Sequence, residues 1–290
     1  MLLASAFLAG CSSTSEKPSW SVDSTGRFSA VCPMAAVAEE ILVKNETYTR
    51  SRLTLHSDEG GDVIAYVAAP EHPLGAVVYV PGAGERVSGH DERMLRYTRA
   101  GYVFLYMDIR GNYGETAGLP FGQQLIQSDY AKFKTEEWPQ YYLTICDLSS
   151  AQRYLTERYA VPVYIVGSSN GGRYAAVAAA VDPDFAGYAG ISTSDWGIYD
   201  AFLGQGYTGD PLRFAASLEP STYIAEISPH PVWIFHARAD PVIPYENGEQ
   251  LFAHAVEPKT FITFNGSHGI DPEVDDRLLS AWAQIYATRG

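Results

Sequence analysis

The chain has 290 residues, 46% of them hydrophobic and 19% charged, so it can bury one large core and shows no compositional sign of disorder. Its 34 acidic residues outnumber its 20 basic ones, which gives a formal net charge of −14. Nucleic acid binds to cationic surfaces, so this charge argues against nucleic acid as a partner.

The first residues of the chain predict export on a lipid anchor. Residues 1–10 are apolar but too short to span a bilayer, which is typical of the apolar region of a signal peptide. The run Leu8-Ala9-Gly10-Cys11 resembles the cleavage and lipidation site of a prokaryotic lipoprotein, although a frayed apolar terminus is the alternative. We therefore expect Cys11 to carry lipid as the only membrane contact, at the cell envelope. Residues 11–30 would form a flexible tether.

Two cysteines remain beyond the predicted lipid anchor, Cys32 and Cys146. In an exported, oxidising setting such a pair can form a disulfide, and two separate buried thiols are the alternative. Neither cysteine belongs to a C-x-x-C or Cys/His spacing, so no metal site is expected.

Strand and helix patterns alternate along the body of the chain. Short apolar runs bounded by glycine or proline predict buried strands, and apolar residues spaced three and four apart predict helices. The first half predicts a hairpin at 50–57 and 62–69, a strand at 76–80, a helix at 90–100, a strand at 102–107, a loop-rich stretch at 110–135 and a helix at 137–159. The second half predicts a strand at 163–166, a helix at 170–181, strands at 185–191 and 232–235, a helix at 245–255, a strand at 261–264 and a helix at 273–287.

This alternation predicts an α/β fold with a mostly parallel central sheet and helices on both faces. No repeat or second linker interrupts the pattern, so residues 31–290 are expected to form one domain. Residues 193–228 lack a strong period and are expected to form a small lid. In sheets of this kind the chemistry lies at the carboxyl ends of the strands.

The segment Gly167-Ser168-Ser169-Asn170-Gly171 fits the pattern G-x-S-x-G, and only Ser169 fits its frame. An apolar strand precedes the segment and an Ala-rich helix follows it, which is the setting of an activated nucleophile. The turn is so tight that glycines must flank the serine, whose hydroxyl then projects from the sheet. The alternative is a plain glycine-rich turn between strand and helix. We predict Ser169 as the nucleophile.

A serine hydroxyl is a weak nucleophile until a base, best a histidine oriented by a carboxylate, takes its proton. In this architecture the order along the chain is serine, acid, histidine. His268 is the predicted base because its loop, Asn265-Gly266-Ser267-His268-Gly269, follows the last strand; an exposed loop histidine is the alternative. Asp240 is the predicted acid because it follows the strand at 232–235, and Asp195 is the second choice.

These segments resemble the α/β-hydrolase superfamily, and most of all its dienelactone-hydrolase and prolyl-oligopeptidase-type catalytic domains. The resemblance rests on residues 167–172, on Asp240 in a segment similar to His-Gly-x-x-Asp-x-x-Val-Pro, and on His268 in a Ser-His-Gly loop. The chain departs from the family at Ala237, where glycine is frequent. The run Asp108-Ile109-Arg110-Gly111 resembles the family's Asp-x-Arg-Gly turn, which we interpret as structural.

An oxyanion hole is expected beside the nucleophile. It should combine the backbone N–H of Asn170 with one from the loop after the strand at 76–80. Ala83 is the expected second donor, with Gly84 next. The family often has His-Gly where this chain has Pro81-Gly82, a change that leaves a backbone donor in place.

The sequence therefore predicts a serine hydrolase that cleaves a carboxylic ester of a small molecule through an acyl-enzyme, with no cofactor or metal. A serine peptidase of prolyl-oligopeptidase type, acting on peptides, is the enzymatic alternative. A third hypothesis is a non-catalytic lipoprotein that keeps the fold as a binding module. The complete set of Ser169, Asp240 and His268 speaks against this third hypothesis.

Overall fold

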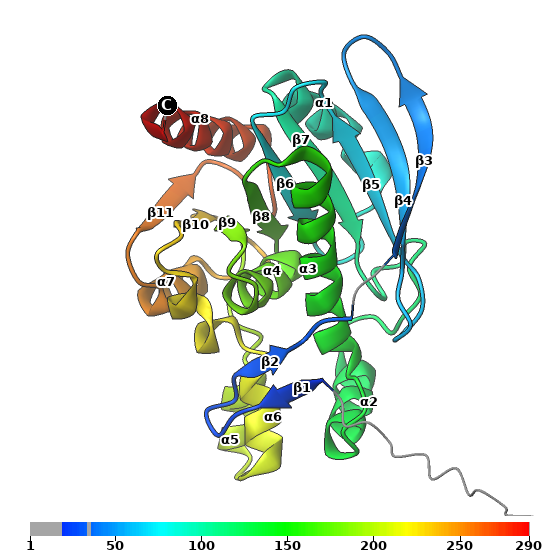
Figure 1. Ribbon diagram of the computed structural model, residues 1–290. Helices are drawn as coiled ribbons and strands as arrows, with labels where there is room; N and C mark the ends of the chain where they lie inside the picture. Colours follow the sequence, from blue (N-terminus) through cyan, green and yellow to red (C-terminus); the bar gives the residue numbers. More distant parts are fainter. Residues whose placement is uncertain (1–18, 34–35, 290) are drawn as a thin grey trace, which may run out of the picture.

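The computed structural model describes residues 19–33 and 36–289. At its centre lies a nine-stranded sheet in the order β11-β10-β9-β8-β6-β7-β5-β4-β3. Strands β6 to β11 run parallel, and β3, β4 and β5 form an antiparallel edge (Figure 1). The sheet strands are β3 (Ala36–Lys44), β4 (Thr49–His56), β5 (Val63–Ala69), β6 (Gly75–Val80), β7 (Tyr102–Asp108), β8 (Val163–Ser168), β9 (Phe185–Ile191), β10 (Val232–Ala237) and β11 (Lys259–Phe264).

Helices cover both faces of this sheet, which confirms the predicted fold class. α3, α4 and α7 pack on one face, and α1 and α8 pack on the other. Every residue of β6, β7 and β8 is buried, because these central strands have helices on both sides. The helices are α1 (Asp91–Arg99), α2 (Gln123–Lys134), α3 (Gln140–Tyr159), α4 (Asn170–Val181), α5 (Ile198–Gly204), α6 (Asp210–Ala216), α7 (Tyr245–His254) and α8 (Pro272–Arg289).

The N-terminal segment differs from the flexible tether expected for residues 11–30. In its described part, strands β1 (Trp20–Val22) and β2 (Phe28–Ala30) pair as an antiparallel hairpin. The Phe28 ring stacks on Tyr142 of α3 with 4.2 Å between ring centroids, and the Phe28 N–H donates to the Tyr223 hydroxyl at 2.8 Å. This burial of an aromatic side chain fixes the segment on the domain. The expected signal peptide at 1–10 and the lipid site at Cys11 lie outside the described residues.

A disulfide joins this hairpin region to the helical layer. Cys32 and Cys146 of α3 are bonded, with 5.1 Å between their Cα atoms and 114 residues between them in sequence. Of the two alternatives that the sequence left open, the structure has the disulfide. The link ties the start of the described chain to the helix that packs under the central strands.

Helix α2 lies within residues 110–135, which the sequence predicted to be a loop-rich stretch and where no helix was expected. Its buried stripe contains Leu125, Asp129 and Phe133, so a carboxylate interrupts the apolar pattern that would have revealed the helix. Asp129 accepts the backbone N–H groups of Gln140 and Tyr141 at 2.8 and 2.9 Å. The polar residue in this stripe therefore caps the first turn of α3.

Residues 193–228, the expected lid, form α5, α6 and two short 3-10 helices at Pro220–Thr222 and Ile224–Ile227. They gather beside the β1–β2 hairpin at one end of the sheet (Figure 1). Their role as a lid stays a prediction. Within the described ranges, no helix combines the length and the apolar character that crossing a membrane requires.

Candidate active site

The predicted nucleophile occupies the turn between β8 and α4. Ser169 has φ 51° and ψ −119°, a conformation that is strained for a residue with a side chain. Glycine is required on both sides of it. A Cβ on Gly167 would collide with the Gly171 carbonyl, and one on Gly171 would collide with the carbonyl of Val80 at the end of β6. The turn therefore holds Ser169 against the end of the neighbouring strand.

The structure brings the three predicted triad residues together. His268 Nε2 lies 2.8 Å from Ser169 Oγ, and His268 Nδ1 lies 3.0 and 2.9 Å from the two carboxylate oxygens of Asp240. Ser169 follows β8, Asp240 follows β10 and His268 follows β11. Since parallel strands end at the same edge of a sheet, residues far apart in sequence meet there.

Exposure differs along this chain of hydrogen bonds. The side chain of Asp240 is fully buried, that of His268 is 21% exposed, and Ser169 is 8% exposed. Burial raises the pKa of the Asp240 carboxyl, but the backbone N–H groups of Ile243 and Val242 and the His268 ring hold it below its ordinary value. Asp240 is thus prepared to stay ionised while His268 gains a proton.

Asp195, the second choice for the acid, and the nearby Asp271 and His236 serve different contacts. Asp195 accepts the backbone N–H of Ser221 at 2.7 Å, and Asp271 accepts the N–H of Glu273 at 2.9 Å in the first turn of α8. His236 is fully buried, and its Nε2 donates to the carbonyl of Ile243 at 3.0 Å. This histidine therefore supports the loop that carries the acid.

The loop after β6 packs against the turn at residues 167–171, which we call the nucleophile turn. Asn112, which was not predicted from the sequence, holds this loop in place. Asn112 Oδ1 accepts the N–H of Gly84 at 2.9 Å, and Nδ2 donates to the carbonyls of Gly82 and Glu85 at 3.1 and 3.3 Å. The N–H of Gly84 is therefore occupied, which leaves Ala83 as the better candidate donor in this loop. Asn170 is the first residue of α4, where a backbone N–H has no partner within the helix.

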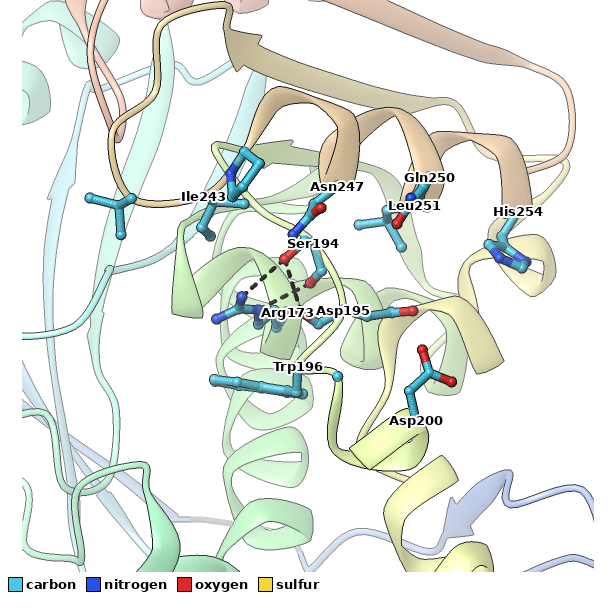
Figure 2. Close-up of a pocket in the computed structure, with 13 residues that line it drawn as sticks. Arg173, Ser194, Asp195, Trp196, Asp200, Ile243, Asn247, Gln250, Leu251 and His254 are labelled. Atoms are coloured by element: carbon cyan, nitrogen blue, oxygen red, sulfur yellow. Dashed lines mark hydrogen bonds between the residues drawn. The ribbon is translucent and has the colours of Figure 1, made fainter. Parts of the chain in front are cut away.

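A cavity of about 430 Å³ lies next to the loop whose N–H groups bind Asp240, and the three triad residues themselves do not line it. Arg173 of α4, the loop after β9, the loop after Asp240 and α7 form its walls (Figure 2). Val242 and Ile243, whose N–H groups bind Asp240, belong to this lining. The cavity is a candidate place for the part of a substrate that does not react.

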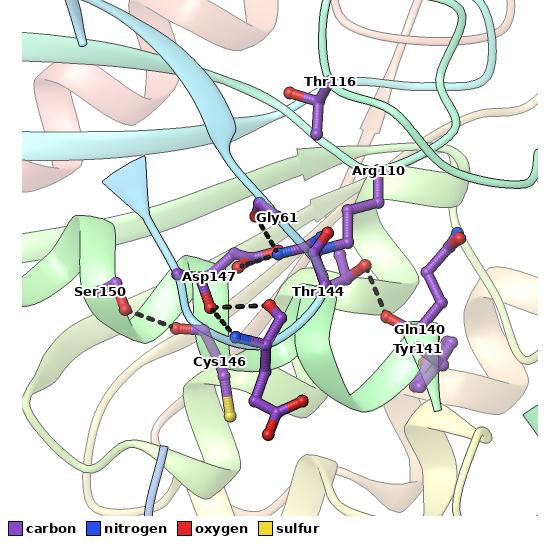
Figure 3. Close-up of polar contacts among 12 residues, drawn as sticks. Gly61, Arg110, Thr116, Gln140, Tyr141, Thr144, Cys146, Asp147 and Ser150 are labelled. Carbon is purple, nitrogen blue, oxygen red and sulfur yellow. Dashed lines mark hydrogen bonds and ion pairs between the residues drawn. The ribbon is translucent and has the colours of Figure 1, made fainter. Parts of the chain in front are cut away.

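Arg110, in the turn after β7, belongs to a separate polar cluster with Asp147 of α3 (Figure 3). Arg110 donates from Nε to Asp147 Oδ2 at 2.7 Å, from Nη2 to Asp147 Oδ1 at 3.1 Å, and to the carbonyls of Gly60 and Gly61. Asp108 accepts the N–H of Thr116 at 2.9 Å. These contacts tie the β4–β5 turn to α3 and agree with the structural interpretation of this turn.

Metal ligands do not gather in the part of the chain that the structure describes, where no group of three or more His, Cys, Asp or Glu side chains could hold an ion. The groups that the structure brings together at the triad are a hydroxyl, an imidazole and a carboxylate.

Comparisons with known proteins identify a family and relatives in sequence. The model of the prolyl oligopeptidase family matches residues 89–265. The uncharacterised protein YfhR of Salmonella typhi is 28% identical in an alignment of 211 residues, which covers 70% of this chain and 66% of that protein. The aligned part thus spans just under two thirds of that relative's length.

Solved structures share the fold. Acetyl xylan esterase 1 from Thermoanaerobacterium sp. superposes with a TM-score of 0.69 at 15% identity, covering 86% of this chain and 87% of that one. An acetyl xylan esterase from a Paenibacillus species gives a TM-score of 0.66 at 17% identity, covering 86% and 89%. Since the family model also matches more than half of the 290 residues, the chain belongs to the prolyl oligopeptidase family and has the α/β-hydrolase fold.

Proposed function

We propose that the protein hydrolyses carboxylic esters through an acyl-enzyme on Ser169. The continuous line of hydrogen bonds from Asp240 through His268 to Ser169 Oγ carries this proposal. An imidazole at 2.8 Å can take the serine proton as the hydroxyl attacks a carbonyl carbon. The buried carboxylate fixes the ring orientation and stabilises the imidazolium that forms.

The reaction then runs in two halves. Ser169 Oγ bonds to the ester carbon, and the negative oxygen of the tetrahedral intermediate accepts the N–H groups of Asn170 and Ala83. His268 gives its proton to the departing alcohol, which leaves the acyl group on Ser169. Water then attacks the acyl carbon while His268 takes one of its protons. As the bond to Ser169 Oγ breaks and the acid leaves, His268 returns that proton to Ser169 Oγ.

Asn112 has a positioning role in this proposal. Its amide fixes the backbone of Gly82, Gly84 and Glu85 on either side of Ala83. A donor that is already oriented when charge develops stabilises the transition state without reorganisation. Asn112 would thus act through the loop and not by contact with substrate.

A serine peptidase is the second candidate, and the match to the prolyl oligopeptidase family favours it. The names of two solved neighbours favour the ester, because those proteins are acetyl xylan esterases. A panel of p-nitrophenyl esters and aminoacyl p-nitroanilides separates the two. We expect Ser169-dependent hydrolysis of the esters with much slower cleavage of the anilides. Ester turnover that is intact in purified S169A would refute the assignment.

We also propose that the protein is exported and held at the cell envelope by lipid on Cys11. The run Leu8-Ala9-Gly10-Cys11 supports this, and the Cys32–Cys146 disulfide supports an oxidising compartment. Labelling with radioactive palmitate in a bacterial host tests it. We expect label and membrane association for the full chain and neither for C11A. A full chain that is unlabelled and absent from the membrane fraction would contradict it.

A further inference from the structure

Arg173 lies in the wall of the cavity next to the loop that binds Asp240 (Figure 2). Its Nη1 donates to the side-chain oxygen of Asn170, the residue that directly follows Ser169 in the chain. The opposite wall contains Val242 and Ile243 from the loop that binds Asp240. A group held at Arg173 would therefore lie near the reacting bond.

The protein fixes the Arg173 guanidinium but does not use all of it. Nε donates to the Ser194 carbonyl at 3.1 Å, Nη2 to Ser194 Oγ at 3.0 Å, and Nη1 to Asn170 Oδ1 at 2.8 Å. The guanidinium also lies 4.4 Å from the ring centroid of Trp196. An arginine has five N–H donors, so one N–H on Nη1 and one on Nη2 are left for a ligand.

The positive charge of Arg173 has no direct counter-ion. Within residues 19–33 and 36–289 it forms no ion pair with a carboxylate, although Arg110 and Arg93 each form one. Burial lowers the pKa of Arg173 even though the charges of Glu219 and Asp195 oppose that shift. A partly buried cation without a partner is costly, and an anionic ligand would offset that cost.

The cavity also has an acidic side. Asp195 and Asp200 belong to its lining, and Figure 2 shows their carboxylates toward His254, away from the Arg173 guanidinium, which lies toward Ile243. Asp195 is engaged by the N–H of Ser221. Two ends of opposite charge would admit one anionic group at Arg173 and disfavour a second one at the far end.

We propose that the substrates are esters that carry one carboxylate, and that Arg173 binds this carboxylate. The planar guanidinium matches the geometry of a carboxylate, and its position is fixed before the ligand arrives. The inference rests on the proposed esterase function and adds the chemical class of the substrate. Arg173 is thereby a specificity-determining residue beside the nucleophile.

Two matched substrate pairs test the inference with the purified full chain. Mono-p-nitrophenyl glutarate and its primary amide place the charge on the acyl side, and para-acetoxybenzoate and para-acetoxybenzamide place it on the leaving group. We expect kcat/KM for the carboxylate to exceed that for the amide by about tenfold or more in one pair, the size of a charge-assisted hydrogen bond. The preferred pair tells which side of the ester the cavity receives.

Variants locate the source of this preference. In R173Q the ratio of carboxylate to amide should fall to near one, and in R173K part of it should remain. R238Q is the matched control, because Arg238 is exposed, stacks over Tyr245 at 4.7 Å and stands close to Asp240 without lining the cavity. It should keep the full ratio. If R173Q does not fold, competitive inhibition of the unchanged protein and of R173K by butyrate against butyramide gives the same comparison with a single carboxylate.

The outcomes separate the inference from the function on which it rests. No preference for the carboxylate in either pair, or a preference that R173Q retains, would overturn the role of Arg173 while neutral esters are still cleaved. A protein that cleaves none of the four esters in a Ser169-dependent manner would overturn both the esterase proposal and this inference.

Discussion

Two polar clusters lie at the carboxyl ends of strands in this sheet. In the closed cluster, Arg110 and Asp147 bind each other. The open cluster consists of the triad and Arg173, and it keeps polar groups that a ligand can bind. Arg110 and Asp147 bind each other through two hydrogen bonds, and their side chains are only 3% and 9% exposed. In the second cluster Ser169 is strained and His268 is partly exposed, and Arg173 forms no ion pair with a carboxylate of the described residues.

The two clusters differ in whether their polar groups bind one another or are left for a ligand. The closed cluster matches opposite charges to each other and holds the β4–β5 turn on α3. The open cluster leaves a hydroxyl, an imidazole and a guanidinium with capacity for a ligand. Departures from local ideality of this kind are expected where a protein acts and not where it is only held together.

The largest effect is expected from a substitution of Asp240, the acid of the open cluster. In D240N, kcat for a neutral ester should fall by about 10³- to 10⁴-fold, because the amide favours the wrong tautomer of His268. D271N is the control, since Asp271 caps α8. It should keep kcat close to that of the unchanged protein. Steady-state kinetics of both variants decide, and an equal loss in both would contradict the assignment of the acid.

Breaking the closed cluster should lower stability and spare catalysis. R110M leaves Asp147 buried without its partner and should reduce the free energy of unfolding by about 3 to 5 kcal/mol. Replacing both partners, in R110M/D147L, should lower stability less than R110M alone. Denaturant unfolding measures this, and a loss of kcat in folded R110M would show that the cluster is not purely structural.

A smaller effect is expected at Asn112, whose side chain holds the loop around Ala83 beside the open cluster. N112A should lower kcat by about tenfold to a hundredfold with little change in KM, because the loop around Ala83 loses its fixed position. N45A is the matched control, since Asn45 caps a turn at Thr47 and Tyr48. If N112A raised KM and kept kcat, Asn112 would serve substrate binding and not the oxyanion.

The smallest effect concerns pH. The pKa of Asp240 is lower in the folded protein than in the unfolded chain, so its ionisation stabilises the fold above a pH of about 4. This contribution is lost as the pH falls through the folded-state pKa. Unfolding free energies of the unchanged protein and D240N should therefore converge below a pH of about 4. A difference that stays constant or widens there would contradict the direction of this shift.

Much of the fold could be predicted because its signals are local. The apolar runs before Asp108 and Ser169 are buried on both faces of the sheet, and buried strands read as continuous hydrophobic segments. The nucleophile turn was visible because its glycines avoid collisions within a few residues. The order of acid and histidine along the chain was enough to select Asp240 and His268 for the geometry found around Ser169.

Other features depend on partners that are distant in sequence. Asn112 binds the Gly82 carbonyl across 30 residues, and no local pattern marks it. Asp129 lies in the buried stripe of α2, and its hydrogen-bond partners are at the start of α3. Because these partners cannot be recognised from the sequence, the apolar pattern of α2 was not recognised as a helix. The role of Arg173 depends on the loop after β9 and on α7, which line the same cavity and are distant from it in sequence.

Labelling with a fluorophosphonate probe tests the central claim, that Ser169 is a nucleophile activated by His268. The probe forms a covalent bond only with an activated serine, and peptide mass spectrometry identifies the modified residue. We predict one label per chain on Ser169, none on S169A, and slow labelling of H268A. An unlabelled full chain, or equal labelling of S169A, would contradict the account.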